Sequence, residues 1–95
     1  MEPKKQLYYL LEHYFAGEYT TQIFADEFSR IYNLELDYRV LSDFERKLMK
    51  ELMEVTVHFS PFEEDFHRHP GLLSNERDVK KKATEVYFAL LNGMS

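Results

Sequence analysis

The chain has 95 residues and a formal net charge of −5, with 12 Lys and Arg against 17 Asp and Glu. The length suits one domain over residues 1–95. The acidic balance excludes a conventional nucleic-acid binder, which needs basic surface for phosphates, and disfavours docking on an anionic membrane. The chain has no cysteine, which excludes a disulfide framework and a thiolate zinc site. Its first residues are too polar for a signal peptide or membrane span, so we expect a cytoplasmic protein.

Two helices are predicted in the first third of the chain. Glycine and proline are rare, with three of each, and this favours helices over a sandwich or barrel. The first helix begins near Pro3 and stops before Gly17, and the second is capped by Thr20 or Thr21 and ends near Asn33. The inward positions at helical spacing are Leu7, Leu10, Leu11, Tyr14 and Phe15, then Phe24, Phe28, Ile31 and Tyr32.

Two further helices are predicted in the rest of the chain. Ser42 and Glu45 have capping-box spacing, and Pro61 closes the helix that they begin. Residues 55–59 alternate like a strand, but no second strand is evident, so we interpret them as the helix end. Ser74 or Asn75 caps the last helix, which ends at 92–93. The inward positions are Phe44, Leu48, Leu52, Val55 and Phe59, then Val79, Ala83, Val86, Tyr87 and Leu90. The sequence therefore predicts an all-α fold, an antiparallel four-helix bundle in a single domain.

One connection, residues 60–73, is too long for a simple link, and ordered loops of that length are usually functional. We expect a helical turn over residues 61–66, with Phe62 and Phe66 on one side.

The acidic residues fall in two blocks. A first acidic block, residues 6–37, holds six acids and one base, and a second acidic block, residues 51–66, holds five acids and no base. A solvated outer face explains such blocks as well as a binding surface does, but the second block brackets the long loop. Complementary potential toward a basic partner is therefore one interpretation of it.

Other chemistry is weakly supported. Adjacent carboxylates at 63–65 have no evident nucleophile beside them, and no phosphate-binding loop is present, so catalysis is not expected. His67 and His69 have weak metal-ligand spacing, and solvated histidines are the favoured interpretation. No cofactor is predicted.

The order of motifs resembles the colicin D-type immunity family. Phe15-Ala16-Gly17-Glu18 with Phe24 and Phe28 resembles the opening of that family. Residues 57–65, Val-His-Phe-Ser-Pro-Phe-Glu-Glu-Asp, resemble its aromatic-Ser/Thr-Pro-acidic segment after the third helix, and the helix over residues 75–91 resembles its closing helix. The resemblance implies a four-helix bundle that blocks a cognate tRNA-cleaving nuclease toxin as an acidic mimic of its substrate.

We therefore expect a non-enzymatic antitoxin whose partner is the toxin's nuclease domain, with no direct contact to nucleic acid or membrane. By position, the resemblance assigns the interface to Glu63, Glu64 and Asp65, while the charge pattern adds Glu51 and Glu54. Phe62 and Tyr38 are candidate aromatic anchors. The alternatives are a generic helical interaction module or homodimer, and a His/carboxylate metal-binding protein.

Overall fold

Helices account for most of the chain in the computed structural model, which describes residues 2–93. The elements in order are α1 (Pro3–Phe15), α2 (Thr21–Arg30), the π-helical turn η1 (Ile31–Glu35), the 3-10 turn η2 (Tyr38–Val40), α3 (Asp43–Val57), α4 (Glu63–Arg68) and α5 (Glu76–Gly93). Residues 2–93 contain no β-strand, only one isolated backbone bridge between Phe59 and Ser74. The predicted all-helical class is confirmed. The four predicted helices correspond to α1, α2, α3 and α5, and the predicted turn in the long loop corresponds to α4.

Local capping explains where the main helices begin. The Thr20 hydroxyl accepts a hydrogen bond from the Ile23 amide, so Thr20 rather than Thr21 caps α2. Ser42 and Glu45 form the predicted capping box at the start of α3. At the other end of α1, Gly17 adopts φ +83°, a left-handed conformation that glycine reaches without steric cost.

Two predicted helix ends need correction. The second helix does not stop near Asn33, because the chain continues through η1, where the Leu36 amide bonds to the Ile31 carbonyl at 2.9 Å. That bond spans five residues and widens the last turn. The third helix ends at Val57, and Phe59 leaves it to form the bridge with Ser74.

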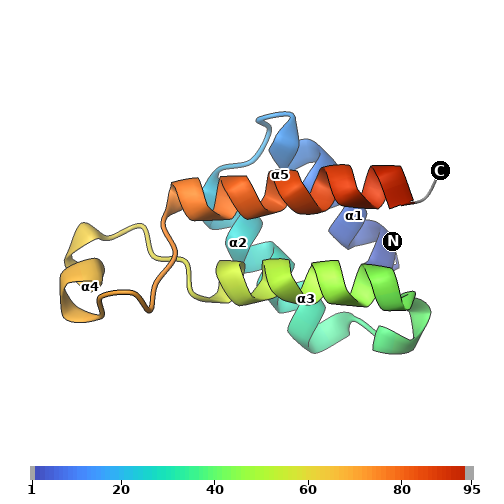
Figure 1. Cartoon of the computed structure of the whole chain (residues 1–95), viewed down its shortest axis with the longest axis horizontal. Helices are drawn as coiled ribbons and strands as arrows, with labels where there is room; N and C mark the ends of the chain where they lie inside the picture. Colours follow the sequence, from blue (N-terminus) through green and yellow to red (C-terminus); the bar gives the residue numbers. More distant parts are fainter. Residues whose placement is uncertain (1, 94–95) are drawn as a thin grey trace.

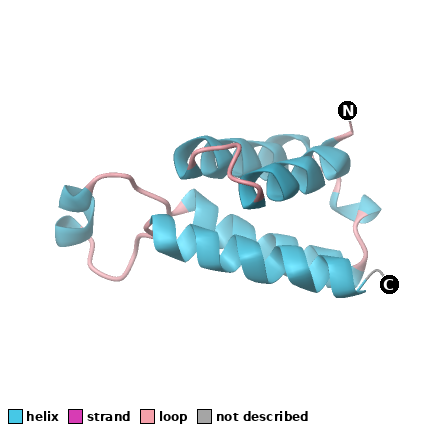
Figure 2. Ribbon diagram, turned by 90° about the horizontal axis from the view of Figure 1, so that it is seen from above, coloured by secondary structure: helices cyan, strands magenta, loops and turns pink. Residues whose placement is uncertain are grey.

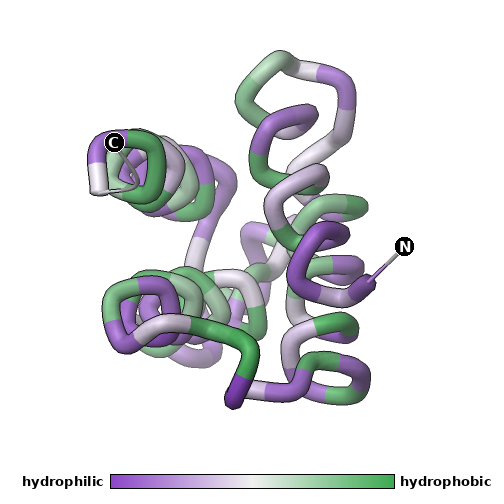
Figure 3. The backbone as a smooth tube through the Cα atoms, turned by 90° about the vertical axis from the view of Figure 1, so that its right-hand side faces the viewer, coloured by the Kyte–Doolittle hydropathy of each residue, from purple (hydrophilic) through white to green (hydrophobic). Residues whose placement is uncertain are grey.

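The main helices are arranged as two layered pairs. α3 and α5 lie side by side and run in opposite directions, and this pair makes the most extensive contact between helices (Figure 1). α1 and α2 form the second layer behind them and cross the first pair obliquely (Figures 1 and 2). Seen end-on, polar and apolar stretches alternate along each helix, as expected for amphipathic helices that share one core (Figure 3).

The core confirms most of the predicted inward positions. Every predicted inward residue of α1, α2 and α5 is buried except Phe15 and Tyr87; Tyr87 packs on the core edge. Phe15 was wrongly predicted to be inward, since half of its side chain is exposed. It lies at the end of α1 and packs on the outer face of α5, with its ring centroid 5.0 Å from that of Tyr87.

The buried face of α3 is rotated from the predicted one. Phe44 was predicted to be inward, but 46% of it is exposed, and Leu48, Val55 and Phe59 are only partly buried at the core edge. The positions that α3 buries are Glu45, Met49, Leu52 and Thr56. The difference arises from tertiary packing. α3 contacts both α2 and α5, so the side of α3 that faces these two helices is the side that is buried.

A buried carboxylate joins α1 to the start of α3. Glu45 is only 6% exposed, and it accepts hydrogen bonds from the Ser42 amide and the Tyr8 hydroxyl, with Lys4 Nζ 3.2 Å away. Burial alone would raise the pKa of Glu45, but these three donors outweigh it and hold the pKa below its ordinary value of 4.5. Glu45 therefore links the two layers most strongly when it is ionised.

Among residues 2–93, no helix combines the length and the apolar character needed to cross a membrane.

We predict that Glu45 makes stability depend on pH in the acid range. Because the folded state lowers the Glu45 pKa, its contribution is complete above pH 4.5 and is lost as the pH falls through the lower folded value. Glu45→Gln should lower the free energy of unfolding by about 1–3 kcal/mol at pH 7 and by much less at pH 3. Urea unfolding of both proteins at the two pH values measures the difference, and an equal loss at both would contradict the assignment.

Candidate functional site

The long loop forms a protrusion beyond the ends of α3 and α5. We use "the protrusion" for residues 60–74, which carry α4 and extend from one end of the molecule (Figures 1 and 2). Two backbone hydrogen bonds close its neck, from the Ser60 amide to the Ser74 carbonyl at 3.1 Å and from the Ser74 amide to the His58 carbonyl at 2.9 Å. The segment is therefore a closed loop held at its base by the ends of two core helices.

A buried serine fixes the start of α4. Ser60 is buried, and its hydroxyl donates to the Asp65 carboxylate at 2.6 Å and accepts from the Phe62 amide at 3.2 Å. Of the predicted site residues, Asp65 is therefore engaged inside the protrusion. Its carboxylate supports the loop as well as contributing charge.

The exposed groups of the protrusion are acidic at one end of α4 and basic at the other. Glu63, Glu64 and Asp65 occupy the first turn of α4, and His67 and Arg68 occupy its last turn. This order suits the helix dipole, which favours negative charge at the N-terminus and positive charge at the C-terminus. The free carboxylates of the protrusion thus gather on the side where α4 begins.

The two aromatic residues predicted to lie on one side of the protrusion differ in exposure. Phe62 is 65% exposed, whereas Phe66 is partly buried and lines a pocket at the base of the protrusion. The physical reason is that Phe62 precedes α4 as its N-cap residue, with φ −101° and ψ 120°, so helical spacing does not apply to it.

Ion pairing distinguishes the two acidic blocks. In the first block three acids pair with arginines, through Arg30–Glu27, Arg30–Glu35 and Arg39–Asp37, and Glu18 is hydrogen bonded to His13. In the second block Glu51 is paired with Lys82 at 3.2 Å. Glu54, Glu63 and Glu64 are exposed and form no ion pair with any residue in 2–93. Three unpaired acids of the second block thus lie on the protrusion and on the end of α3 that leads into it, whereas the unpaired Glu12 and Asp26 lie on α1 and α2.

The structure separates Tyr38 from the other predicted site residues. Tyr38 lies in η2, which precedes α3, whereas the protrusion follows α3 at its other end (Figure 1). Its ring packs 5.3 Å from that of Tyr32, and its hydroxyl donates to the Tyr32 carbonyl at 3.5 Å. A partner that covers the protrusion would contact Tyr38 only if its surface also extended along the whole of α3.

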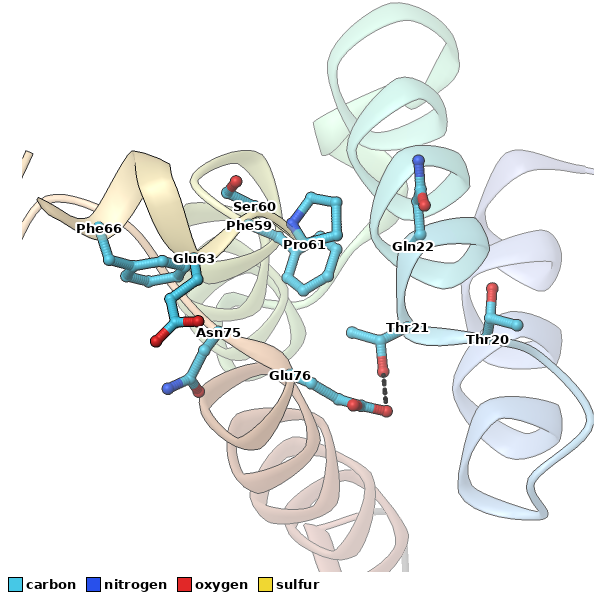
Figure 4. Close-up of a pocket in the computed structure, with 10 residues that line it drawn as sticks. All are labelled: Thr20, Thr21, Gln22, Phe59, Ser60, Pro61, Glu63, Phe66, Asn75 and Glu76. Carbon is cyan, nitrogen blue, oxygen red and sulfur yellow. Dashed lines mark hydrogen bonds between the residues drawn. The ribbon is translucent and has the colours of Figure 1, made fainter. Parts of the chain in front are cut away.

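A pocket of about 520 Å³ lies at the base of the protrusion, where the starts of α2 and α5 converge (Figure 4). Its lining residues come from three parts of the chain: Thr20, Thr21, Gln22, Phe59, Ser60, Pro61, Glu63, Phe66, Asn75 and Glu76. Of these, only Glu63 was predicted as a site residue. Thr20, Thr21 and Asn75 were predicted as cap candidates, which mark helix starts and do not show that two starts meet.

One carboxylate of this pocket is held by a buried hydroxyl. Thr21 is buried, and its Oγ1 lies 2.7 Å from the Tyr14 hydroxyl and donates to Glu76 Oε1 at 3.2 Å (Figure 4). Burial raises the pKa of Tyr14, with the nearby Glu76 adding to the rise and the Thr21 hydrogen bond opposing it. Glu76 thus joins α5 to α1 and α2 through one polar contact.

The histidines that could have held a metal do not gather with other ligands. His67 and His69 are exposed, and His58 Nδ1 is hydrogen bonded to the Glu54 carbonyl at 2.7 Å. Across residues 2–93, no group of three or more His, Cys, Asp or Glu side chains is placed to hold a metal ion.

Comparison of the chain with known protein families, with curated proteins and with solved structures found no significant match. Function is therefore inferred from the charge, exposure and geometry of the chain itself.

We predict that Ser60 controls the order of the protrusion rather than the stability of the core. Ser60→Ala removes both of its hydroxyl hydrogen bonds, while the neck's backbone bonds remain, so local opening should become easier by about 1–3 kcal/mol. Trypsin should then cleave after Arg68 faster, and amide exchange in α4 should accelerate. Ser74→Ala is the control, because the Ser74 hydroxyl makes no hydrogen bond within residues 2–93; equal effects in both variants would contradict the prediction.

Proposed function

We propose that this chain is an immunity protein, a cytoplasmic antitoxin that inhibits a cognate nuclease toxin domain by direct binding. The protrusion and the adjoining end of α3 would face the toxin's basic active-site cleft, and the toxin would be a tRNA-cleaving nuclease. The observation that carries the proposal is that Glu54, Glu63 and Glu64 are exposed and form no ion pair within residues 2–93.

The physical basis is electrostatic complementarity. A nuclease cleft must be cationic to hold phosphates, so closely spaced carboxylates compete for the same positions. Carboxylates already paired within the chain would have to break those pairs, whereas Glu54, Glu63 and Glu64 are available at no such cost. Phe62 at the exposed start of α4 offers an apolar anchor beside them.

The fold supports the proposal at the level of architecture. The resemblance implies an antiparallel four-helix bundle, and we propose that α1, α2, α3 and α5 form it, with α4 inserted before the last helix. Supporting this, α3 and α5 run in opposite directions and the four helices share one buried core. In such an arrangement the protein acts by occlusion and needs neither a catalytic group nor a cofactor.

Charge reversal on α4 tests the proposal. Glu63→Lys with Glu64→Lys should slow association with the toxin about tenfold or more at low salt, and the difference should shrink as salt is raised. The probe is the basic C-terminal domain of the large secreted protein expected in the upstream reading frame, and stopped-flow kinetics measures the association rate.

The matched control changes the net charge equally at another place. Glu12→Lys with Asp26→Lys alters two exposed acids of the first acidic block that form no ion pair within residues 2–93. The control should affect association far less. Equal slowing in both double variants, or no slowing in either, would reject the protrusion as the interface, and failure of the chain to rescue growth on co-expression with that domain would reject the antitoxin function.

A second candidate function is self-association without a toxin partner. An exposed aromatic patch favours it: the Phe15 ring lies 5.0 Å from Tyr87 and 5.3 Å from Phe88, and Phe15 and Phe88 are about half exposed. Toxin binding does not require two copies of this chain to associate through that patch. Sedimentation velocity over a range of concentrations decides between them, because a dimer through this patch should dissociate on Phe88→Ser, whereas a monomer at all concentrations rejects the alternative.

A further inference from the structure

An open groove with apolar walls lies along the outer side of α1. It has a volume of about 690 Å³, and Tyr8, Tyr9 and Leu91, from the end of α5, line it between charged residues. Tyr9 is 42% exposed and Leu91 is 52% exposed, so apolar surface is left facing the solvent. We propose that this groove is the interface of a homodimer, in which α1 of one copy packs against α1 of a second copy in the opposite direction.

The dimer goes beyond the antitoxin function and does not depend on it. The start of α1 lies beside the C-terminal end of α5, whereas α4 lies beyond the other end of α5 (Figure 1). The groove and the protrusion are therefore at opposite ends of the molecule. A dimer through the groove leaves the protrusion of each copy accessible to a partner.

The charges on α1 complement their own reversed order. Lys5 and Glu12 are seven residues apart, which is two helical turns or about 10 Å, so both lie on the outer stripe that carries the two tyrosines. Both are exposed, and neither forms an ion pair within residues 2–93. A second α1 that runs in the opposite direction, with the twofold axis between Tyr8 and Tyr9, sets Lys5 of each copy opposite Glu12 of the other. The stripe therefore fits a second copy of itself.

The same charges select the direction of the second helix. A parallel copy would place Lys5 against Lys5 and Glu12 against Glu12, and like charges across an interface repel each other. Lys4 does not alter this balance, because it is already paired with the buried Glu45 at 3.2 Å. Glu2, at the end of the groove, lies outside the paired stripe. The antiparallel arrangement is therefore the one that the charges favour.

The two tyrosine rings are held in place within each copy. Tyr9 stacks on His13 with their ring centroids 3.9 Å apart, and the Tyr8 hydroxyl donates a hydrogen bond to Glu45. A side chain that is already fixed loses little conformational freedom on association, so more of its apolar burial contributes to affinity. The tyrosines thus supply the attraction between copies, and the charges on either side of them set the register.

Charge reversal at single positions tests the dimer. The interface is small, so we expect the unmodified chain to dimerise with a dissociation constant on the order of 100 μM, measured by sedimentation equilibrium. Lys5→Glu and Glu12→Lys should each weaken dimerisation about tenfold or more, because each creates two repulsive pairs in a symmetric dimer, and the loss should shrink as salt is raised. Both positions are exposed, and an unchanged melting temperature verifies the fold. A chain that stays monomeric up to about 1 mM, or single variants that dimerise as tightly as the unmodified chain, would overturn the proposal.

A mixture of the two single variants tests the antiparallel register. In the mixed dimer both contacts join opposite charges again, so it should be about tenfold tighter than the dimer of either variant alone. With one variant isotope-labelled, native mass spectrometry distinguishes mixed from unmixed dimers. Lys81→Glu and Asp26→Lys are the matched control pair, since both residues are exposed and lie outside the groove. The control variants should dimerise like the unmodified chain, and a test mixture without preference for the mixed dimer would overturn the proposal.

Phe88→Ser distinguishes this dimer from one through the aromatic patch. Phe88 packs against Phe15 at the end of α1 and does not line the groove, so Phe88→Ser should change dimerisation no more than about twofold. Dissociation of the dimer by Phe88→Ser, while both charge variants still dimerise, would place the interface on the aromatic patch and overturn the proposal.

Discussion

The neck of the protrusion is the constraint from which the candidate site follows. Two backbone hydrogen bonds tie residues 58–60 to Ser74, at the point where α3 has ended and α5 is about to begin. Because α3 and α5 pack side by side, their adjoining ends are already close, and closing the loop between them costs little further entropy. The chain between them must then leave the core and return, and it leaves with its acidic turn outward. The placement of the acids thus follows from helix packing as much as from charge.

Internal ion pairs determine which acids remain available to a partner. A lone arginine in the first acidic block, Arg30, bridges Glu27 and Glu35, and a lysine of α5 reaches across to Glu51. These surface pairs contribute little to stability, since exposed pairs gain about 0–1 kcal/mol. Their larger effect is on the field around the molecule, because they neutralise the outer faces of the core helices. Unpaired acids remain at the start of α4, in a stretch, residues 51–66, that holds no Lys or Arg.

Residues with a structural duty limit how the site can vary. Asp65 belongs to the acidic turn by sequence, but its bond to buried Ser60 makes it part of the scaffold of α4. Glu76 has the same double character, since it holds Thr21 on one side and faces the pocket on the other. Such residues fix the geometry in which Glu63 and Glu64 are presented. Changes at the two glutamates should therefore alter binding, whereas changes at the supporting residues alter both binding and order.

The sequence by itself determined the helical class, the capping box at Ser42, two adjacent cap candidates each for α2 and α5, and most of the inward face of α1, α2 and α5, because those features depend on residues within a few positions of one another. It also located the acidic turn and the long loop. Tertiary structure decided what depends on distant neighbours. It turned α3 so that Glu45 and Met49 are buried in place of Phe44, since α2 and α5 contact α3 from two sides. It placed Tyr38 away from the protrusion, and it brought the starts of α2 and α5 together into a pocket that local periodicity does not encode. The net charge of −5 can be read from the sequence, whereas the pairing of Glu51 with Lys82 depends on the packing of α3 against α5.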